Sequence, residues 1–318
     1  MSREFGETSL GSIELFCLAA DLESFTAAAQ QAGITPAAVS RAIGRLEERF
    51  GVRLFVRSTR RVRLTDSGRE YHLQCKQALA QLVDAERQLT GHQTAPSGLV
   101  RISAPTTFGH HRLLPLLPAF RALHPGVEVE VHLSNRNIDF TADGFDLAVR
   151  AREQADSGLV ARKLMDAELT VVGTPQYFAR RPAPVSPDDL QDHECIQFLL
   201  PRTGQRVPWR LRVDGEERDL QTNGGLVCSE DILGCATLAR AGAGLLQTYR
   251  FIVEKDISQG TLVEVLKPFG GASRPFSLIY PGSRHMPLRV RALADFLAAS
   301  LQRGGRDPLK KSDSRPAD

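Results

Sequence analysis

The segment "SFTAAAQQAGITPAAVSRAIGRLEERFG", Ser24 to Gly51, carries two helix-start signals close together. Ser24 is a residue type that caps helix N-termini, because its hydroxyl accepts a hydrogen bond from a free backbone N–H. Thr35 followed by Pro36 marks a second start, since proline fits the first helical turn, where its missing N–H has no partner. Gly33 and Gly51 stand where the two helices should end. The segment therefore predicts two helices joined by a tight turn.

The side chains of these two helices favour a helix-turn-helix motif. The alanines at 27–29 let the following helix approach closely, and a first helix is predicted before them, over 12–25. Helical periodicity turns Val39, Ile43 and Leu46 toward a core. In a helix-turn-helix motif the second helix enters the major groove of DNA. Its outer face here carries Ser40, Arg41 and Arg45.

A basic hairpin is predicted directly after the motif. "RLFVRSTRRVRL", residues 53–64, alternates around Ser58 and Thr59, so arginines gather at the tip of a short wing. Regularly spaced arginines alone could equally form the solvated face of a helix. Together with the capped turn, the basic wing favours DNA binding.

A long helix is predicted after the wing, with Thr65 as its N-cap and Asp66 in its first turn. Apolar or small residues recur on it at alternating spacings of four and three, which is a heptad pattern. Such a helix could lie on its own domain, but the polar residues around the seam favour contact between two chains. The predicted dimerisation residues are Tyr71, Cys75, Ala78, Leu82, Ala85 and Leu89.

The remaining chain reads as alternating strands and helices, which is typical of a parallel α/β sheet. Strands are expected at 99–104, 127–134 and 145–151, with one helix over 106–125 between the first two. A turn around Asp166 should precede a second such unit. A helix at 288–302 should return to the first lobe, and the charged tail 303–318 is expected to be disordered.

Composition and motifs exclude several classes of protein. The net charge is only +3, and the hydrophobic and charged fractions, 42% and 24%, are those of a globular protein. An acidic N-terminus without a signal-peptide pattern, and no apolar stretch long enough to span a membrane, predict a cytoplasmic location. We find no catalytic motif and no cluster of metal ligands, and His110 and His111 are better explained as solvated or capping residues, so we expect no enzyme, metal or cofactor.

These motifs together resemble the LysR-type transcriptional regulator family over nearly the whole chain. The carrying stretches are the block 16–68, "DGFDLAVRA", "LVARKL", "LTVVGTPQYF" and "ARAGAGLL", in the expected order. The resemblance implies an α/β protein with an N-terminal all-α winged helix-turn-helix, a linker helix and a two-lobed effector-binding domain similar to periplasmic binding proteins. The implied bounds are 9–65, 66–91, a hinge at 92–98, and 99–302, with lobe I at 99–165 and 268–302 and lobe II at 166–267.

The resemblance also implies which residues face DNA. Helix starts and hydroxyls suit phosphate oxygens, while arginine can also reach a guanine edge. Pro36 stands where many relatives have glutamine, so base reading should depend more on Ser40, Arg41 or DNA shape. The expected DNA-binding residues are Ser24, Thr26, Thr35, Pro36, Ala37, Ser40, Arg41, Arg45, Arg57, Ser58, Arg60 and Arg61.

Two strand-to-helix turns are expected to face a cleft between the lobes, because free N–H groups and the helix dipole lie there. Ser229 is expected to cap the second of these helices. Each residue has a structural alternative: Thr106 or Thr107 could only cap a helix, and Arg150 could pair with Asp143 or Asp146. The expected effector-binding residues are Pro105, Thr106, Thr107, Phe108, Arg150, Arg202, Cys228 and Ser229.

The sequence thus predicts a regulator that binds double-stranded promoter DNA under the control of a small-molecule effector, with an organic acid preferred. The family is usually tetrameric, so a homodimer or homotetramer is expected, with RNA polymerase as a further candidate partner. Two alternatives stay open: a solute-binding protein, and a redox-sensing variant that uses Cys228 and Cys235.

Overall fold

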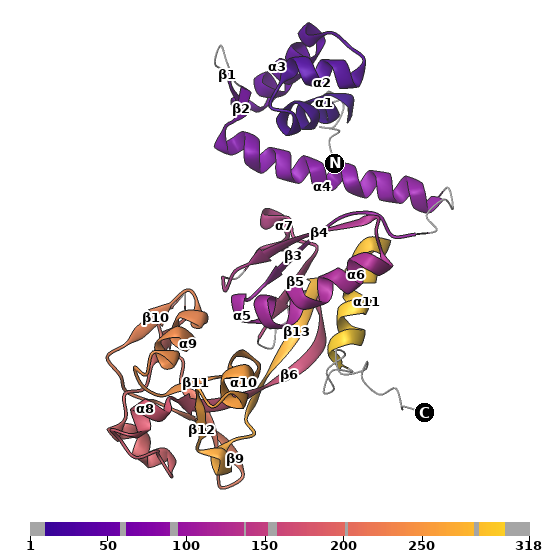
Figure 1. Ribbon diagram of the computed structural model, residues 1–318. Coiled ribbons are helices and arrows are strands. Elements are labelled where there is room, and N and C mark those ends of the chain that lie inside the picture. The colour runs from indigo at the N-terminus through magenta and orange to yellow at the C-terminus, as the bar shows by residue number, and fades with distance from the viewer. Residues whose placement is uncertain are drawn as a thin grey trace, which may run out of the picture. The chain divides into compact units, whose positions relative to one another are not determined.

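The computed structural model describes residues 10–57, 62–89, 95–136, 138–151, 158–200, 203–282 and 286–302. The chain divides into two compact units, an N-terminal unit of residues 1–94 and 141–144 and a C-terminal unit of residues 95–140 and 145–318 (Figure 1). Several predictions lie outside the described residues: the wing tip at 58–61, part of the hinge at 92–98, Arg202 and the tail 303–318.

The N-terminal unit begins with three helices, α1 (Leu10–Asp21), α2 (Phe25–Ala32) and α3 (Pro36–Phe50). The predicted caps are confirmed: the hydroxyls of Ser24 and Thr35 each accept a hydrogen bond, 3.2 Å long, from the backbone N–H three residues ahead. Gly33 and Gly51 end α2 and α3 with φ angles of 69° and 67°, which glycine adopts without a steric penalty.

A small apolar core holds the three helices together. Val39 and Ile43 on α3 are fully buried, as predicted, and pack with Phe16 of α1. Ala28 and Ala29 on α2 are also buried, and α2 and α3 contact each other directly. The side chains that the sequence placed inside the motif therefore form its core.

The wing and the long helix follow. Strands β1 (Phe55–Arg57) and β2 (Val62–Leu64) pair antiparallel, and α4 runs over Asp66–Leu89. Thr65 caps α4 as predicted, because its hydroxyl accepts from the N–H of Gly68 at 2.9 Å. The same hydroxyl donates to the carbonyl of Arg53 at 2.7 Å, which ties the start of α4 to the base of the wing.

The C-terminal unit is built on one seven-stranded sheet in the order β11-β6-β13-β5-β3-β4, with β12 also paired to β6. Strand β3 is parallel to β4 and β5, whereas β13 is antiparallel to β5 and β6. The parallel arrangement predicted for the first three strands is therefore confirmed, whereas the antiparallel strand β13 makes the whole sheet mixed. The strand bounds are β3 (Gly98–Ala104), β4 (Val127–Leu133), β5 (Leu147–Arg150), β6 (Leu159–Gly173), β11 (Leu246–Tyr249), β12 (Val263–Val265) and β13 (Ser273–Pro281).

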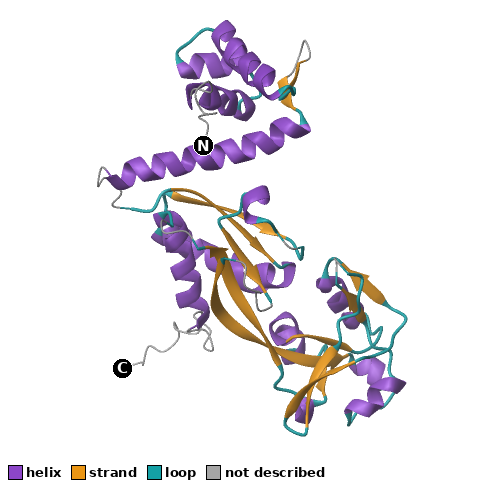
Figure 2. Cartoon of the chain, turned by 180° about the vertical axis from the view of Figure 1, so that it is seen from behind, coloured by secondary structure: helices purple, strands orange, loops and turns teal. Residues whose placement is uncertain are grey.

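The turn predicted around Asp166 is also wrong. Strand β6 continues through Asp166, because β13 pairs with it from Leu159 to Glu168 and supplies backbone partners on both sides of that residue. A register shift between Phe276 and Ser277 of β13 accommodates the long pairing. Figure 2 shows these two strands running side by side as the longest of the sheet.

The helix predicted over 106–125 is interrupted. It consists of α5 (Thr106–Phe108), a π-helical turn at Gly109–Leu113, a 3-10 turn at Leu114–Leu116 and α6 (Leu117–Leu123). Pro115 and Pro118 explain the breaks, since each lacks the N–H of a regular helix and its ring crowds the carbonyl four residues back.

Two lobes are built on this sheet. Lobe I contains β3, β4 and β5 with α5, α6 and α11 (Leu288–Gln302), and Arg289 of α11 donates to the carbonyl of Leu99 at 2.8 Å. The short helix α7 spans Phe140–Asp143. Lobe II contains β11 and β12, and β6 and β13 connect the lobes. The other elements of lobe II are α8 (Pro175–Phe178), a 3-10 turn (Pro187–Asp192), β7 (Gln197–Leu199), β8 (Trp209–Val213), β9 (Glu216–Leu220), β10 (Val227–Ser229), α9 (Ile232–Arg240), α10 (Arg250–Ser258) and a 3-10 turn (Lys267–Phe269).

Candidate DNA-binding surface and effector pocket

The outer face of α3 is exposed. Thr35, Pro36 and Ala37 at its start are exposed, as are Arg41 and Arg45 further along, while Ser40 is half-buried. Among the residues described, neither arginine has a hydrogen bond or an ion pair. Both guanidinium groups are therefore available to an external anion such as a phosphate.

The buried carboxylate of Glu47 holds the wing against α3. Its Oε1 accepts hydrogen bonds from the backbone N–H groups of Leu54 and Phe55 at 2.9 and 3.1 Å, and its Oε2 accepts one from Arg53 at 2.9 Å. The sequence analysis missed this role. A signal was present, since position 47 falls on the same helical stripe as Ile43, which is the buried face of α3.

The other predicted DNA-binding residues lie at the motif's edges. Ser24 is half-buried and caps α2, and Thr26 is exposed in the first turn of that helix. Arg57 ends β1. Ser58, Arg60 and Arg61 lie outside the residues that the structure describes, so their role stays a prediction.

The predicted heptad seam of α4 divides into two parts. Tyr71 and Cys75 pack into the core of their own unit, where the Tyr71 ring lies 5.2 Å from Phe16 and 5.0 Å from Phe50 between centroids. Ala78 is exposed, and Leu82 beyond it is 47% exposed. Among the described side chains of the predicted seam, those that are exposed therefore begin after Cys75.

In the C-terminal unit, the two turns predicted to face the cleft contact each other directly. The Thr106 hydroxyl of lobe I donates to Asp231 Oδ1 of lobe II at 2.8 Å. Asn135 donates to the backbone carbonyl of Glu230, and Arg136 forms an ion pair with the Glu230 carboxylate at 3.4 Å. We call these five residues the interlobe latch.

The cap of α9 differs from the prediction. Ser229 ends β10, and Glu230 takes a left-handed conformation with φ of 63°. The chain therefore enters α9 two residues later, and Asp231 is the N-cap, accepting from the N–H of Leu233 at 3.0 Å. A carboxylate of the protein itself thus occupies this helix start.

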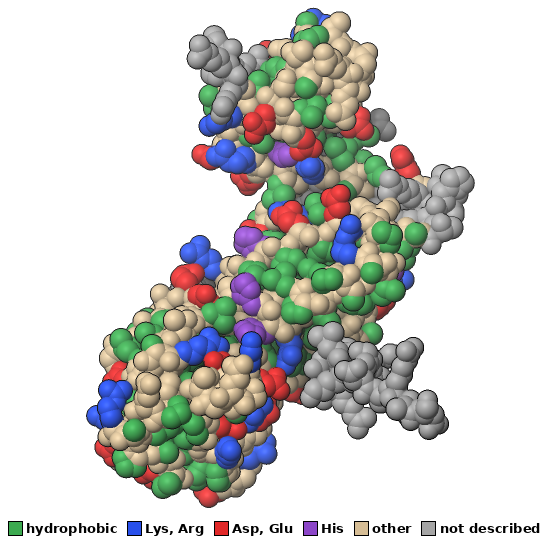
Figure 3. Space-filling view, viewed as in Figure 1, with side chains coloured by type: hydrophobic (Ala, Val, Ile, Leu, Met, Phe, Trp, Pro, Cys, Tyr) green, Lys and Arg blue, Asp and Glu red, His purple; other side chains and the backbone are tan. Residues whose placement is uncertain are grey.

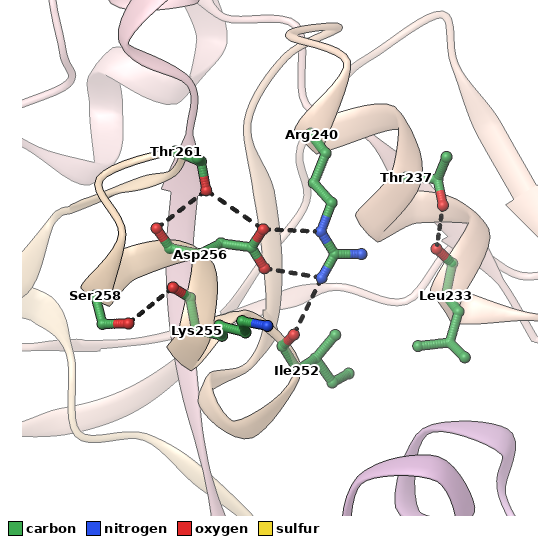
Figure 4. A network of polar contacts seen from close by, with 8 residues as sticks. All are labelled: Leu233, Thr237, Arg240, Ile252, Lys255, Asp256, Ser258 and Thr261. Carbon is green, nitrogen blue, oxygen red and sulfur yellow. Dashed lines mark hydrogen bonds and ion pairs between the residues drawn. The ribbon is translucent and has the colours of Figure 1, made fainter.

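The other end of α9 is fixed to α10 (Figure 4). The guanidinium of Arg240 forms two hydrogen bonds with the carboxylate of Asp256, 3.1 and 2.8 Å long, and a third with the carbonyl of Ile252. The bonds from Arg240 lower the pKa of Asp256. The far end of α9 is therefore anchored to α10 by three hydrogen bonds.

Next to the latch, lobe II contains a mostly apolar pocket with a cavity of about 50 Å³. Its walls include Ile196, Phe198 and Trp209, and Ile232 in the first turn of α9 closes one side. The pocket and the latch therefore meet at the same end of α9, where Ile232 lines the pocket and Asp231 accepts from Thr106.

Tyr249 on β11 and Arg274 on β13 lie on the same face of the sheet at this pocket, and neither side chain has a hydrogen-bond partner among the described residues. The side chain of Thr248 lies on the opposite face, and its buried hydroxyl has no partner there either. Thr248 is only 2% exposed, so its hydroxyl is cut off from water. Gln247 lies beside them, but its amide is used, since it accepts from the N–H of Arg210 and donates to the carbonyl of the same residue, both at 2.8 Å.

The remaining predicted effector residues lie around the cleft without meeting in this pocket. Thr107 and Phe108 are buried, and Phe108 stacks on Phe276 with 5.0 Å between ring centroids. Arg150 is buried and donates to the hydroxyl of Ser103 and to two backbone carbonyls. Pro105 is half-buried. The sequence analysis missed Trp209 and Arg274, for which no local motif exists.

Cys228 and Cys235 lie close enough for Cys228 to influence the pKa of Cys235, whose thiol donates to the backbone carbonyl of Gln197 at 3.5 Å. Cys235 is fully buried, and burial raises its pKa to about 12. Oxidation by peroxides starts from the thiolate, so this environment disfavours Cys235 as a redox centre at neutral pH. The redox-sensing alternative is therefore less well supported than regulation by an effector.

Other features of the described residues are less informative. They contain no group of three or more possible metal ligands, and none of their helices has the length and apolar character needed to cross a membrane. Figure 3 shows basic and acidic side chains interspersed over the visible face of the C-terminal unit. His111 is half-buried against Phe251, and burial lowers its pKa.

Comparison with known proteins gives one consistent result. Residues 10–69 match the family model "Bacterial regulatory helix-turn-helix protein, lysR family", and residues 93–302 match "LysR substrate binding domain". The chain is 33% identical to the HTH-type transcriptional regulator PtxR of Pseudomonas aeruginosa over 306 residues, 96% of each chain. It is 30% identical to the regulator CrgA of Neisseria meningitidis over 297 residues, 93% of this chain and 98% of CrgA.

The comparison with solved structures gives the same result. The structure of CrgA is similar with a TM-score of 0.59 at 28% identity, covering 93% of this chain and 99% of CrgA. The full-length virulence activator AphB of Vibrio cholerae is similar with a TM-score of 0.58 at 26% identity, covering 92% of this chain and 99% of AphB.

Proposed function

The chain belongs to the LysR family of transcriptional regulators, and from this premise we propose that α3 binds the major groove while the C-terminal unit responds to a small effector. The family and the function are those predicted from the sequence: a DNA-binding regulator with an effector-binding domain, and not an enzyme. One observation carries the DNA-binding assignment: Arg41 and Arg45 lie on the exposed face of α3, and neither has a hydrogen bond or an ion pair among the described residues.

Each part of the motif has a separate role in this proposal. The hydroxyls and helix starts at Ser24, Thr26 and Thr35 contact phosphates and set the position of the protein. Arg41 reaches a guanine edge or a phosphate, and Pro36 and Ala37 make apolar contacts in the groove. The wing residues Arg57, Ser58, Arg60 and Arg61 contact the backbone or the minor groove.

We further propose that the protein binds DNA as a homodimer or homotetramer. The exposed Leu82 and Val83 in the second half of α4 support this, because neither is covered within its own unit. Two heads on one assembly would contact two half-sites, so a near-palindromic operator is expected.

The effector acts by binding one arrangement of the lobes more tightly than another, and a coupling of about 1–3 kcal/mol is typical of such linkage. The interlobe latch and the adjacent pocket support this part of the proposal, since a ligand that changes the position of α9 also changes the contact between Thr106 and Asp231.

The DNA-binding assignment is tested by measuring affinity against salt concentration. Fluorescence anisotropy with a labelled fragment from upstream of the protein's own gene compares the wild type with Arg45→Ala. If Arg45 neutralises a phosphate, the slope of log affinity against log salt falls by about 1. Arg291→Gln, an exposed arginine of α11, is the matched control and should change neither affinity nor slope. Equal affinities and slopes for Arg45→Ala and the wild type would contradict the assignment.

A further inference from the structure

The interlobe latch contains a backbone conformation that its residue type disfavours. Glu230 has a φ of 63°, and across it the N–H of Asp231 donates to the carbonyl of Ser229 at 2.7 Å. A hydrogen bond between residues two positions apart closes a γ-turn, and the form with a positive φ at its centre is rare and strained. The Cβ atom of a glutamate adds to this strain. Contacts from outside the turn must therefore compensate for its cost.

Two residues of lobe I supply such contacts. The side-chain amide of Asn135 donates to the backbone carbonyl of Glu230, and Arg136 forms an ion pair with the Glu230 carboxylate at 3.4 Å. The side chains of Arg136 and Glu230 are 74% and 54% exposed, so water screens the ion pair. The bond from Asn135 acts on the peptide unit itself, and it is therefore the contact that can fix the backbone conformation at residue 230.

The Asn135 amide is held in place by its own lobe. Its oxygen accepts from the backbone N–H of Thr106 at 3.3 Å, and its nitrogen donates to the Thr106 hydroxyl at 3.1 Å. The N–H of Thr106 and the carbonyl of Glu230 are both satisfied only with the amide in this orientation. Asn135 therefore reaches Glu230 from a fixed position, and lobe I determines where the Glu230 carbonyl lies when the lobes are closed.

The helix that follows the turn is stabilised without it. Asp231 caps α9 by accepting from the N–H of Leu233 at 3.0 Å, and its carbonyl accepts from the N–H of Gly234 at 3.1 Å. The other end of α9 is anchored to α10 by Arg240 (Figure 4). All of these bonds lie within lobe II, so relaxation of the turn at Glu230 does not require α9 to unfold.

We propose that Glu230 is a strained catch between the lobes. When the lobes are closed, Asn135 holds Glu230 in the left-handed turn, and when they separate the turn relaxes to an ordinary conformation. Relaxation offsets part of the attraction within the latch, so the closed arrangement is poised to open. The inference rests on the proposed function, because it names the element that regulates the arrangement of the lobes.

The test is a double-mutant cycle between the two lobes. Glu230→Gly, Glu230→Ala and Glu230→Val all remove the carboxylate, but glycine adopts a positive φ freely, alanine does so at a cost, and β-branched valine is the least tolerant. Each is made in the full-length chain with Asn135 present and with Asn135→Ala. Urea unfolding of the C-terminal unit is followed by the fluorescence of Trp209, the single tryptophan of the chain.

The expected result is a dependence on residue 230 that needs Asn135. The unfolding equilibrium constant of the alanine variant, divided by that of the glycine variant, should be about fivefold larger with Asn135 than without it, from the usual cost of a left-handed residue. The ratio for valine should be larger again. Glycine also makes the unfolded chain more flexible, but this effect is the same in both backgrounds and cancels.

Two further measurements accompany the cycle. Arg136→Gln is the matched control for Asn135→Ala, because it changes the neighbouring residue without touching the Glu230 carbonyl, and it should leave the ratios unchanged. Hydrogen exchange reports both lobes: the segment at Thr106 in lobe I and the start of α9 in lobe II should each exchange faster in the valine variant than in the glycine variant, by about fivefold or more. Far-UV circular dichroism verifies that each variant is folded.

Two results would overturn the inference. Equal ratios with and without Asn135 would show that lobe II alone holds the turn, and faster exchange confined to lobe II would show that the turn does not act on the other lobe. Specific DNA binding is measured on the same samples. If it is retained while the cycle fails, the catch is wrong but the regulator assignment stands. If the cycle succeeds but specific DNA binding is absent, the proposed DNA-binding surface fails instead.

Discussion

Replacing Glu47 should weaken the N-terminal unit by loosening the wing from α3. Glu47 Oε1 accepts both backbone N–H groups, of Leu54 and Phe55, whereas Oε2 accepts a hydrogen bond from the guanidinium of Arg53. Both residues that donate their N–H groups are at most 3% exposed, so water cannot easily replace the carboxylate. Glu47→Ala and Glu47→Gln should therefore differ in a specific way.

The magnitudes follow from these contacts. Alanine leaves two buried donors unpaired at about 1–3 kcal/mol each, so we expect Glu47→Ala to lower the free energy of unfolding by about 3 kcal/mol. Glutamine keeps one oxygen that can accept both N–H groups and loses mainly the ion pair with Arg53, whose side chain is 77% exposed. Such an exposed pair contributes about 0–1 kcal/mol, and Glu47→Gln should therefore cost about 1 kcal/mol.

The assay is urea unfolding followed by two signals. Far-UV circular dichroism reports the helices of both units, and Trp209 fluorescence reports the C-terminal unit alone. The transition of the N-terminal unit is therefore the part of the dichroism change that the fluorescence does not follow. Glu48→Ala, an exposed neighbour on the same helix, is the control and should change stability by less than about 0.5 kcal/mol. Equal losses for Glu47→Ala and Glu47→Gln, or a shift of the Trp209 transition alone, would refute the reasoning.

Three further predictions concern other close contacts. Gly68→Ala puts a methyl group against the carbonyl oxygen of Leu54 and should cost the N-terminal unit about 2 kcal/mol in urea unfolding; unchanged stability would mean that the chain relaxes there. Arg240→Ala should destabilise the C-terminal unit by only about 1 kcal/mol at neutral pH. The Arg240 side chain is 41% exposed, so water partly screens its hydrogen bonds to Asp256. Since Arg240 lowers the pKa of Asp256, this contribution to stability is present above the ordinary aspartate pKa of about 3.9 and is lost as the pH falls through the lowered pKa. The free energies of unfolding of the wild type and of the variant, followed by Trp209 fluorescence, should therefore converge in acid. Thr106→Val removes one latch bond and should speed hydrogen exchange at the start of α9, whereas unchanged exchange would show that this bond does not hold the lobes.

Local features of the fold were predictable from the sequence. The caps at Ser24, Thr35 and Thr65 were found because capping depends on a side chain and a backbone N–H only three residues apart. The buried face of α3 followed from helical periodicity. The family resemblance then supplied the domain order, and the comparisons confirm the family.

Features that depend on distant partners were not predictable in this way. The turn expected at Asp166 does not form because β13, more than 100 residues further along, pairs with β6 across that point. The pocket unites Trp209, Thr248 and Arg274 from three different strands, so no short motif marks it. Ser229 was assigned as a cap from its type alone, whereas the left-handed turn at Glu230 gives that role to Asp231.

The central claim is that exposed α3 binds a specific DNA site, and DNase footprinting tests it most directly. The purified protein and its Arg41→Ala variant are applied to DNA upstream of the protein's own gene at two salt concentrations. We predict a protected, near-palindromic site whose protection weakens at higher salt and in Arg41→Ala. Protection that is identical for the two proteins at both salt concentrations would contradict the claim.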